Sequence, residues 1–288
     1  MRIGITHHTT YTYDRPIKAL VQVLRLTPRD HDGQHVLKWQ IEPSADGRLR
    51  RQEDSLGNVV HVFSADGSPQ ELTMRVTGEV ETNDTGGVIR GSVERLPALF
   101  YLRETDLTTA DDDLRAFAVD AAGAFKSDPL DALHRLLASL HQTVEFDDQP
   151  TDTGTTAAES FAMKKGVCQD LSHIFIAASR HLEIPARYVS GYFHRNDGVV
   201  DQVAGHAWAE ALIPGLGWVG FDPANGISAT DAHIRVAIGL DYLGAAPIRG
   251  SRMGGGSEHL DVRLSVDNKP APSQTQHQGQ GQSQSQVS

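Results

Sequence analysis

Three residue types that could together transfer an acyl group occur in order along the second half of the chain. The single cysteine, Cys168, lies in residues 165–170 (KGVCQD), and it is followed by a histidine, His206, and an aspartate, Asp222. A thiolate can attack an amide carbonyl, an imidazole can move the proton, and a carboxylate can orient the imidazole. These three residues are therefore the parts of a Cys-His-Asp site.

Cys168 is predicted to lie at the start of a helix. Gly166 permits a sharp turn just before it, and Pro185 ends the helical pattern that follows. The apolar residues at helical spacing are Leu171, Ile174, Phe175, Ala178 and Leu182. Unpaired N–H groups and the positive dipole end at a helix N-terminus favour a thiolate and could stabilise an oxyanion.

His206 and Asp222 are predicted to meet across a β-hairpin. Strand-like segments flank residues 214–217 (PGLG), which are a hairpin signal. If Leu212 faces Trp218, His206 comes near the level of Asp222, displaced by one or two positions. Diagonal neighbours on paired strands are about 7–8 Å apart, a gap that these two side chains can bridge.

Each of the three residues also has a purely structural interpretation. A lone cysteine is most often a buried, small apolar residue, and a strand histidine or an aspartate before proline is ordinary. A non-catalytic binding module on the same fold is therefore the competing hypothesis. Loss of one of the three residues would have indicated such a module, and none is lost.

Four segments resemble the bacterial transglutaminase-like superfamily. They are residues 166–170 (GVCQD), 184–192 (IPARYVSGY), 206–210 (HAWAE) and 217–223 (GWVGFDP). Residues 8–13 and 24–29 resemble the β-domain that often precedes such cores. The resemblance implies a papain-like α+β core with Cys168 as nucleophile, His206 as general base and Asp222 as its orienting group.

Residues near the triad are predicted to support it. Asp170 and His173 resemble the family pattern and are expected to act structurally rather than react. Trp208 is expected in the core, with shielding of the triad as the alternative. Gln169 is placed in the surrounding shell or cleft, and Arg187 is expected to pair with an acidic group. No calcium-type ligand loop stands out, so neither a metal nor another cofactor is predicted.

The pattern along the chain predicts an α+β fold with two domains and a tail. Alternating strands in residues 1–85 indicate an antiparallel sandwich or barrel, and residues 86–267 hold the catalytic domain with a late C-terminal strand. Residues 268–288 are rich in Gln and Ser and are predicted to be disordered. Thr109 is predicted to cap the first helix, and residues 127–129 (SDP) to start the second.

Composition limits the partners and the location. The net charge of −11 argues against nucleic acid and against an anionic membrane surface. No apolar run approaches the roughly 20 residues of a membrane helix, and the N-terminus has no signal-peptide pattern. A lone cysteine excludes an intrachain disulfide. These features favour a cytoplasmic protein.

The predicted substrate is a protein or a peptide. Water as the acceptor would give a protease or amidase, whereas a primary amine would give a transglutaminase, and the triad serves both reactions. No amine site is visible in the sequence, which slightly favours hydrolysis. The sequence does not predict the oligomeric state.

Overall fold

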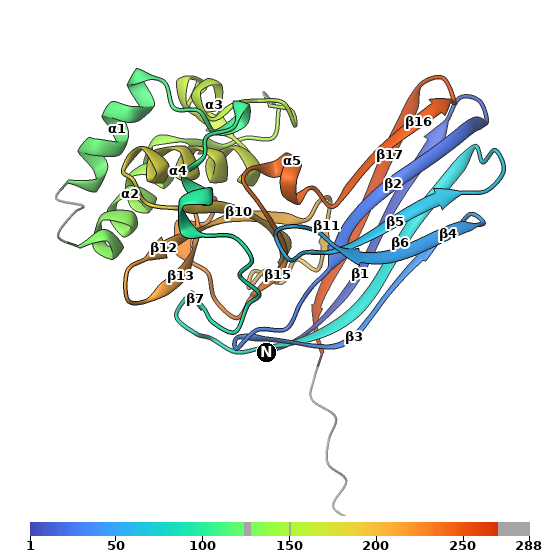
Figure 1. Ribbon diagram of the computed structural model, residues 1–288, viewed down its shortest axis with the longest axis horizontal. Helices are drawn as coiled ribbons and strands as arrows, with labels where there is room; N and C mark the ends of the chain where they lie inside the picture. Colours follow the sequence, from blue (N-terminus) through green and yellow to red (C-terminus); the bar gives the residue numbers. More distant parts are fainter. Residues whose placement is uncertain (124–127, 150, 270–288) are drawn as a thin grey trace, which may run out of the picture.

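The computed structural model of the 288-residue chain describes residues 1–123, 128–149 and 151–269 (Figure 1). It contains both helices and sheets, and its strand pairs are antiparallel except for β8 (Glu145–Phe146) with β9 (Lys165–Gly166). The predicted α+β class is thus confirmed. Ser127, and residues 270–288 of the predicted disordered tail, lie outside the described residues.

Two sheets form the β-rich part of the molecule at the right of Figure 1. One has the order β11 (Asp201–Gln202), β17 (Glu258–Asn268), β1 (Arg2–Tyr13), β6 (Glu71–Thr82), β3 (Gln34–Pro43). The other has the order β16 (Ile248–Gly254), β2 (Ile17–Thr27), β5 (Val59–Ala65), β4 (Gly47–Glu53). Apolar side chains of both sheets, such as Leu24 and Val76, pack into one core. This arrangement agrees with the sandwich expected for the N-terminal strands.

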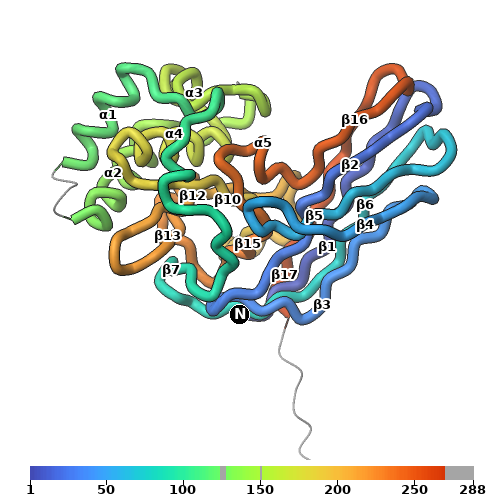
Figure 2. Tube along the Cα trace, viewed as in Figure 1, coloured from blue at the N-terminus to red at the C-terminus, as the bar shows by residue number. Residues whose placement is uncertain are grey.

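The late strands return to the N-terminal sheets. β17 pairs with β1 from Ile3 opposite Asn268 to Tyr13 opposite Glu258, and β16 pairs with β2. Figure 2 shows the red end of the trace running beside its blue beginning. This pairing differs from the grouping of residues 258–267 with the second domain. Alternation along the sequence identifies a strand but does not say which distant strand it joins.

Strand β4 is absent from the expectations drawn from the sequence. Its residues 47–53 (GRLRRQE) are mostly charged, and they form the outer strand of their sheet. Charged side chains are common on edge strands because they discourage pairing with other molecules. The same charges hide the strand from a search for apolar alternation.

In the second half of the chain, helices pack on one face of a sheet whose strands differ in length. The sheet order is β14 (Ile227–Ser228), β13 (Gly217–Asp222), β12 (His206–Ile213), β10 (Ala186–Phe193), β15 (His233–Gly239), with β7 (Val88–Ile89) beside β13. The helices are α1 (Asp112–Ala122), α2 (Pro129–Thr143), α3 (Ala157–Met163), α4 (Cys168–His181) and α5 (Tyr242–Ala245), with short 3-10 turns η1 (Ala98–Leu102) and η2 (Asp106–Thr108). Ala207, Ala209 and Ala211 belong to the core that also contains α4, and such small side chains allow a helix to lie close to a strand.

The starts of α1 and α2 are each capped by an aspartate. The Asp128 carboxylate accepts a hydrogen bond from the Asp131 N–H at 3.0 Å, and α2 has proline at its first position, as predicted. The predicted cap of the first helix was wrong, because Asp111, not Thr109, accepts the bond from Leu114. The Thr109 hydroxyl instead donates to the carbonyl of Thr105, in the turn that precedes α1.

No helix within the described ranges is both long enough and apolar enough to cross a membrane.

Candidate active site

Cys168 is the first residue of α4, as predicted. Val167 precedes it in an extended conformation, and the Asp170 carboxylate accepts a hydrogen bond from the Val167 N–H at 2.9 Å. A Cβ at position 166 would lie 2.7 Å from Asp170 Cβ and 2.7 Å from Ser160 Oγ. Gly166 is not among the residues with positive φ, so close packing rather than a sharp turn requires glycine there.

His206 and Asp222 meet at the end of the β12–β13 hairpin. Leu212 lies opposite Trp218, which is the predicted register. His206 Nε2 lies 2.7 Å from Asp222 Oδ2, and the Asp222 side chain is fully buried. The hairpin thus joins the imidazole to the carboxylate.

The ionisation of His206 depends on both of its neighbours. Burial alone would lower its pKa, but the hydrogen bond to Asp222 and the interaction with the Cys168 side chain raise the pKa of His206 to about 10. Burial favours a neutral Asp222, yet hydrogen bonds from His206 and His233 hold the pKa of Asp222 well below its usual range. The carboxylate and the cysteine side chain therefore both favour an imidazolium at His206.

Two further residues bind the same carboxylate and were not predicted. His233 Nε2 lies 3.0 Å from Asp222 Oδ2, and Asn225 Nδ2 lies 2.7 Å from the same oxygen. His233 begins β15, whose sequence, residues 233–239 (HIRVAIG), is typical of a strand. That signal could have predicted the strand, but not the position of the strand beside β10.

The α4 residues that were predicted to support the triad, Gln169, Asp170 and His173, bind backbone groups of neighbouring segments. His173 Nε2 accepts a hydrogen bond from the Tyr242 N–H at 3.0 Å, and burial lowers the pKa of His173 to about 3, so the ring is neutral. Burial raises the pKa of Asp170, whose carboxylate binds the helix start. Gln169 is largely buried, with Nε2 3.5 Å from the carbonyl of Thr153. These contacts favour a structural role for the three residues, in which they hold α4 and the loop before it, over a direct part in the reaction.

Trp208 lies between the site histidines and a small group of core residues. It is buried with Val189 and Ile238, as expected of a core residue. Its ring also lies 6.0 Å from that of His206 and 5.1 Å from that of His233, measured between centroids. The side chain therefore both fills the core and excludes water from one side of the histidines.

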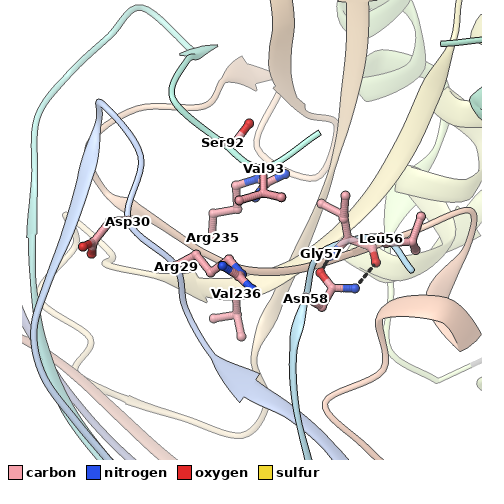
Figure 3. A pocket seen from close by; sticks show the side chains of 10 residues that line it. Arg29, Asp30, Leu56, Gly57, Asn58, Ser92, Val93, Arg235 and Val236 are labelled. Carbon is pink, nitrogen blue, oxygen red and sulfur yellow. Dashed lines mark hydrogen bonds between the residues drawn. The ribbon is translucent and has the colours of Figure 1, made fainter. Parts of the chain in front are cut away.

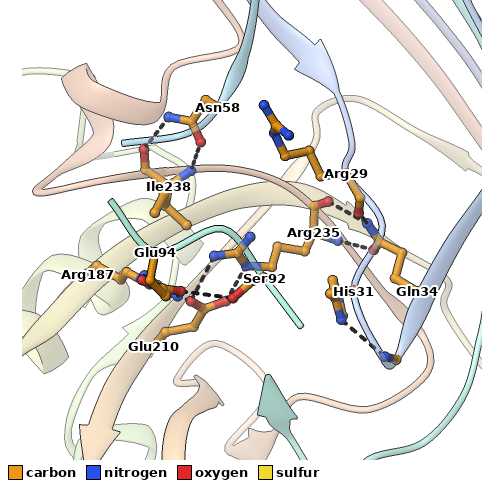
Figure 4. Close-up of polar contacts among 11 residues, drawn as sticks. Arg29, His31, Gln34, Asn58, Ser92, Glu94, Arg187, Glu210, Arg235 and Ile238 are labelled. Atoms are coloured by element: carbon orange, nitrogen blue, oxygen red, sulfur yellow. Dashed lines mark hydrogen bonds and ion pairs between the residues drawn. The ribbon is translucent and has the colours of Figure 1, made fainter. Parts of the chain in front are cut away.

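A buried ion cluster, here called the Arg187 cluster, lies on the face of the sheet that also carries His206. Arg187 Nε and Arg235 Nε each lie 2.6 Å from an oxygen of Glu210, and Glu94 binds Arg187 at 2.7 Å (Figure 4). The Arg187 guanidinium also lies 3.8 Å from the centroid of the Trp218 ring. Two arginines face two glutamates, so the cluster has no excess charge with which to hold a ligand. The predicted pairing of Arg187 is confirmed.

A small cavity separates the N-terminal segments from β15. Asn58, Val93 and Arg235 are among the residues that line it (Figure 3), and it encloses about 10 Å³. That is close to the space of one water molecule, so it is a packing seam and not a substrate cleft.

Two segments of the chain match known protein families. Residues 3–81 match the bacterial transglutaminase-like N-terminal region, and residues 118–223 match the transglutaminase-like superfamily. Residues 118–223, which include Cys168, His206 and Asp222, are thus similar to the transglutaminase-like superfamily. The chain is 29% identical to an uncharacterized protein of Mycobacterium leprae, over 92% of this chain and 98% of that one. It is 28% identical to an uncharacterized protein of Mycobacterium tuberculosis, over 93% of each.

A solved structure has the same fold. A protein from Cytophaga hutchinsonii, described as a proposed cysteine protease, superposes with a TM-score of 0.73. The superposition covers 94% of this chain and 93% of that one, at 20% identity. At this identity the likeness establishes the fold, and the chemistry must be argued from the residues.

Proposed function

We propose that this protein is a thiol-dependent enzyme that hydrolyses amide bonds of a peptide or protein substrate, with Cys168 as nucleophile, His206 as general acid and base, and Asp222 as the orienting group. The observation that carries the proposal is the distance of 2.7 Å between His206 Nε2 and Asp222 Oδ2, beside a cysteine at the start of α4. The Cys168 side chain is also among the groups that raise the pKa of His206. The description of the Cytophaga hutchinsonii protein agrees with this class.

The reaction would pass through an acyl-enzyme. The Cys168 thiolate adds to the carbonyl carbon, and N–H groups at the start of α4, including that of Cys168, would stabilise the oxyanion. The C–N bond then breaks as the protonated His206 gives its proton to the leaving amine. His206 next takes a proton from water, whose oxygen attacks the thioester, and the carboxylic acid and the thiolate are released.

The acceptor separates this proposal from its nearest alternative, a protein-glutamine amine transferase. Both enzymes form the same thioester, and they differ only in whether water or a primary amine attacks it. A glutamine-peptide library incubated with a labelled primary amine, and analysed by mass spectrometry beside Cys168→Ser, distinguishes them. Cleaved or deamidated peptides formed only by wild type support the hydrolase. Incorporated amine would instead establish the transferase.

The competing class is a non-catalytic binding module on the same fold. Alkylation of Cys168 by iodoacetamide tests this class without a known substrate. A thiolate paired with His206 should react faster than a free thiol at about pH 6, and His206→Ala should remove the excess. Alkylation no faster than free thiol, or unaffected by His206→Ala, contradicts the enzyme proposal.

We further propose a reducing compartment such as the cytoplasm. The chain has one cysteine, and the proposed chemistry needs it as a thiol, so an oxidising compartment would give the protein no structural benefit.

We also propose that the chain divides into two domains between residues 85 and 86, and that the first domain supports the second.

A further inference from the structure

We infer that His233 is a positioning residue of this site, which holds the Asp222 carboxylate in the orientation that His206 requires. The inference rests on the proposed function, because it concerns the group that orients the general base. It adds a second histidine, from a different strand, to the three residues of the triad.

The geometry places both histidines on one oxygen. Asp222 Oδ2 lies 2.7 Å from His206 Nε2 and 3.0 Å from His233 Nε2. The side chain of His233 is 2% exposed and that of Asp222 is 0% exposed. Asn225 supplies a third donor to the same oxygen. A carboxylate held from three directions has little freedom to turn away from His206.

A backbone contact decides which nitrogen of His233 carries the proton. The Thr230 N–H donates to His233 Nδ1 at 3.0 Å. Because a backbone N–H can only donate, Nδ1 must be the acceptor, and the proton of the neutral ring is on Nε2. His233 therefore donates to Asp222 and does not compete with His206 as a base toward the thiol.

The same contact argues against a metal ion at this place. Ligand atoms of His206, Asp222 and His233 lie within 4.8 Å of one another, which is close enough to suggest a cation site. A cation bound to His233 Nε2 would require the proton on Nδ1, where it would face the Thr230 N–H. The donor set fits a hydrogen-bonded carboxylate better than a metal centre.

The strand that carries His233 is held by the N-terminal part of the chain. β15 is an outer strand of its sheet, so one of its edges has no strand partner in the part of the chain that the structure describes. Gln34 accepts from the Arg235 N–H at 2.8 Å and donates to the Arg235 carbonyl at 2.9 Å. Asn58 forms the same two bonds with Ile238, both at 2.8 Å (Figure 4). These two side-chain amides form the hydrogen bonds that a neighbouring strand would form with β15, and so hold this edge in place.

Loss of the hydrogen bond that His233 donates to Asp222 should make the Cys168 thiolate less stable. In His233→Leu the Asp222 carboxylate loses one donor and can turn from His206, so the imidazolium that stabilises the thiolate is held less firmly. We expect alkylation of Cys168 to slow by about tenfold near pH 6, with the acid limb of its pH profile moved to higher pH. His233→Gln keeps an N–H near the position of Nε2 and should recover most of the rate.

The test is the pH profile of iodoacetamide alkylation for wild type, His233→Leu, His233→Gln and His206→Ala. The matched control is His181→Leu, at the exposed far end of α4, and circular dichroism checks that each variant is folded. If wild type reacts faster than a free thiol and His233→Leu has the same pH profile as wild type, the inference is overturned and the proposed function stands. The same holds if His233→Gln reacts as slowly as His233→Leu. A wild type no faster than free thiol overturns the proposed function and the inference together.

A measurement on the wild-type protein covers the case in which a variant does not fold. Two-bond ¹H–¹⁵N spectra of the histidine rings, recorded at mildly alkaline pH, report the tautomer directly. The inference requires a neutral His233 with the proton on Nε2. A proton on Nδ1 would overturn it.

Discussion

Gln34 forms a two-bond pair with the backbone of Arg235, a residue 201 positions later in the chain. The pair joins β3, in the N-terminal sheets, to β15, at the edge of the sheet that carries His206. An amide side chain is suited to this contact because it offers one donor and one acceptor, as a neighbouring strand would. The N-terminal region is therefore part of the support of the candidate site.

Gln34→Leu should loosen this edge. It leaves the Arg235 N–H without its acceptor, and we expect a loss of about 1–3 kcal/mol in the free energy of unfolding. Hydrogen exchange should also become faster at the Arg235 amide. Gln40→Leu is the control, since Gln40 is exposed on the same strand and bonds to Glu42. Unchanged exchange at Arg235 in Gln34→Leu would show that the amide pair does not hold the strand.

Glu210 should be the most costly member of the Arg187 cluster to neutralise. Its side chain is 0% exposed and binds both Arg187 and Arg235. Glu210→Gln leaves the buried Arg187 with Glu94 alone and takes the carboxylate partner from Arg235, so we expect a loss of about 3–5 kcal/mol in the free energy of unfolding in urea. Asp261→Asn disrupts an exposed pair with Arg263 and should cost less than about 1 kcal/mol. Equal costs for the two variants would contradict the role of the cluster.

The same glutamate predicts how stability depends on acid. Burial raises the pKa of Glu210, but Arg235 and Arg187 lower it to about 2, from an ordinary value of 4.5. Because the folded pKa is depressed, this contribution is fully present above about pH 4.5 and is lost as the pH falls toward 2. Urea midpoints measured across that range should fall more steeply for wild type than for Glu210→Gln. Parallel curves would mean that Glu210 does not titrate as proposed.

The sequence predicted the parts of the site that depend on local structure. The turn at residues 214–217 fixes which residues of its two strands face each other, so the pairing of His206 with Asp222 followed from counting. The helix start at Cys168 followed from the apolar spacing after it. Both inferences concern residues whose positions are set by the element that contains them.

What the sequence did not predict depends on contacts between distant elements. His233 reaches Asp222 because β15 pairs with β10 and not with its neighbours in sequence. The amide pair of Gln34 and the return of β17 to β1 are of the same kind. Nothing in the residues around position 233 indicates which carboxylate that histidine will meet. Such contacts are set by the packing of the whole chain.

The thiol position should be sensitive to a single methyl group at residue 166. In Gly166→Ala the new Cβ would lie 2.7 Å from Asp170 Cβ and from Ser160 Oγ, a separation that packed atoms do not tolerate. Either the start of α4 or the end of α3 must shift, and Cys168 would move relative to His206. We expect alkylation near pH 6 to slow by about tenfold or more, since small displacements of reacting groups are costly.

Gly154→Ala is the matched control for this substitution. A Cβ there meets Asp152 Oδ1 at 3.3 Å, and Gly154 is not among the glycines with positive φ. Both variants add one methyl group to the segment before α4, but the methyl of Gly166→Ala alone presses on the first turn of that helix. Comparable alkylation rates in the two variants would mean that the packing at Gly166 does not set the position of the thiol. A slow Gly166→Ala with an unchanged Gly154→Ala would show that the close packing at Gly166 holds Cys168 where His206 can reach it.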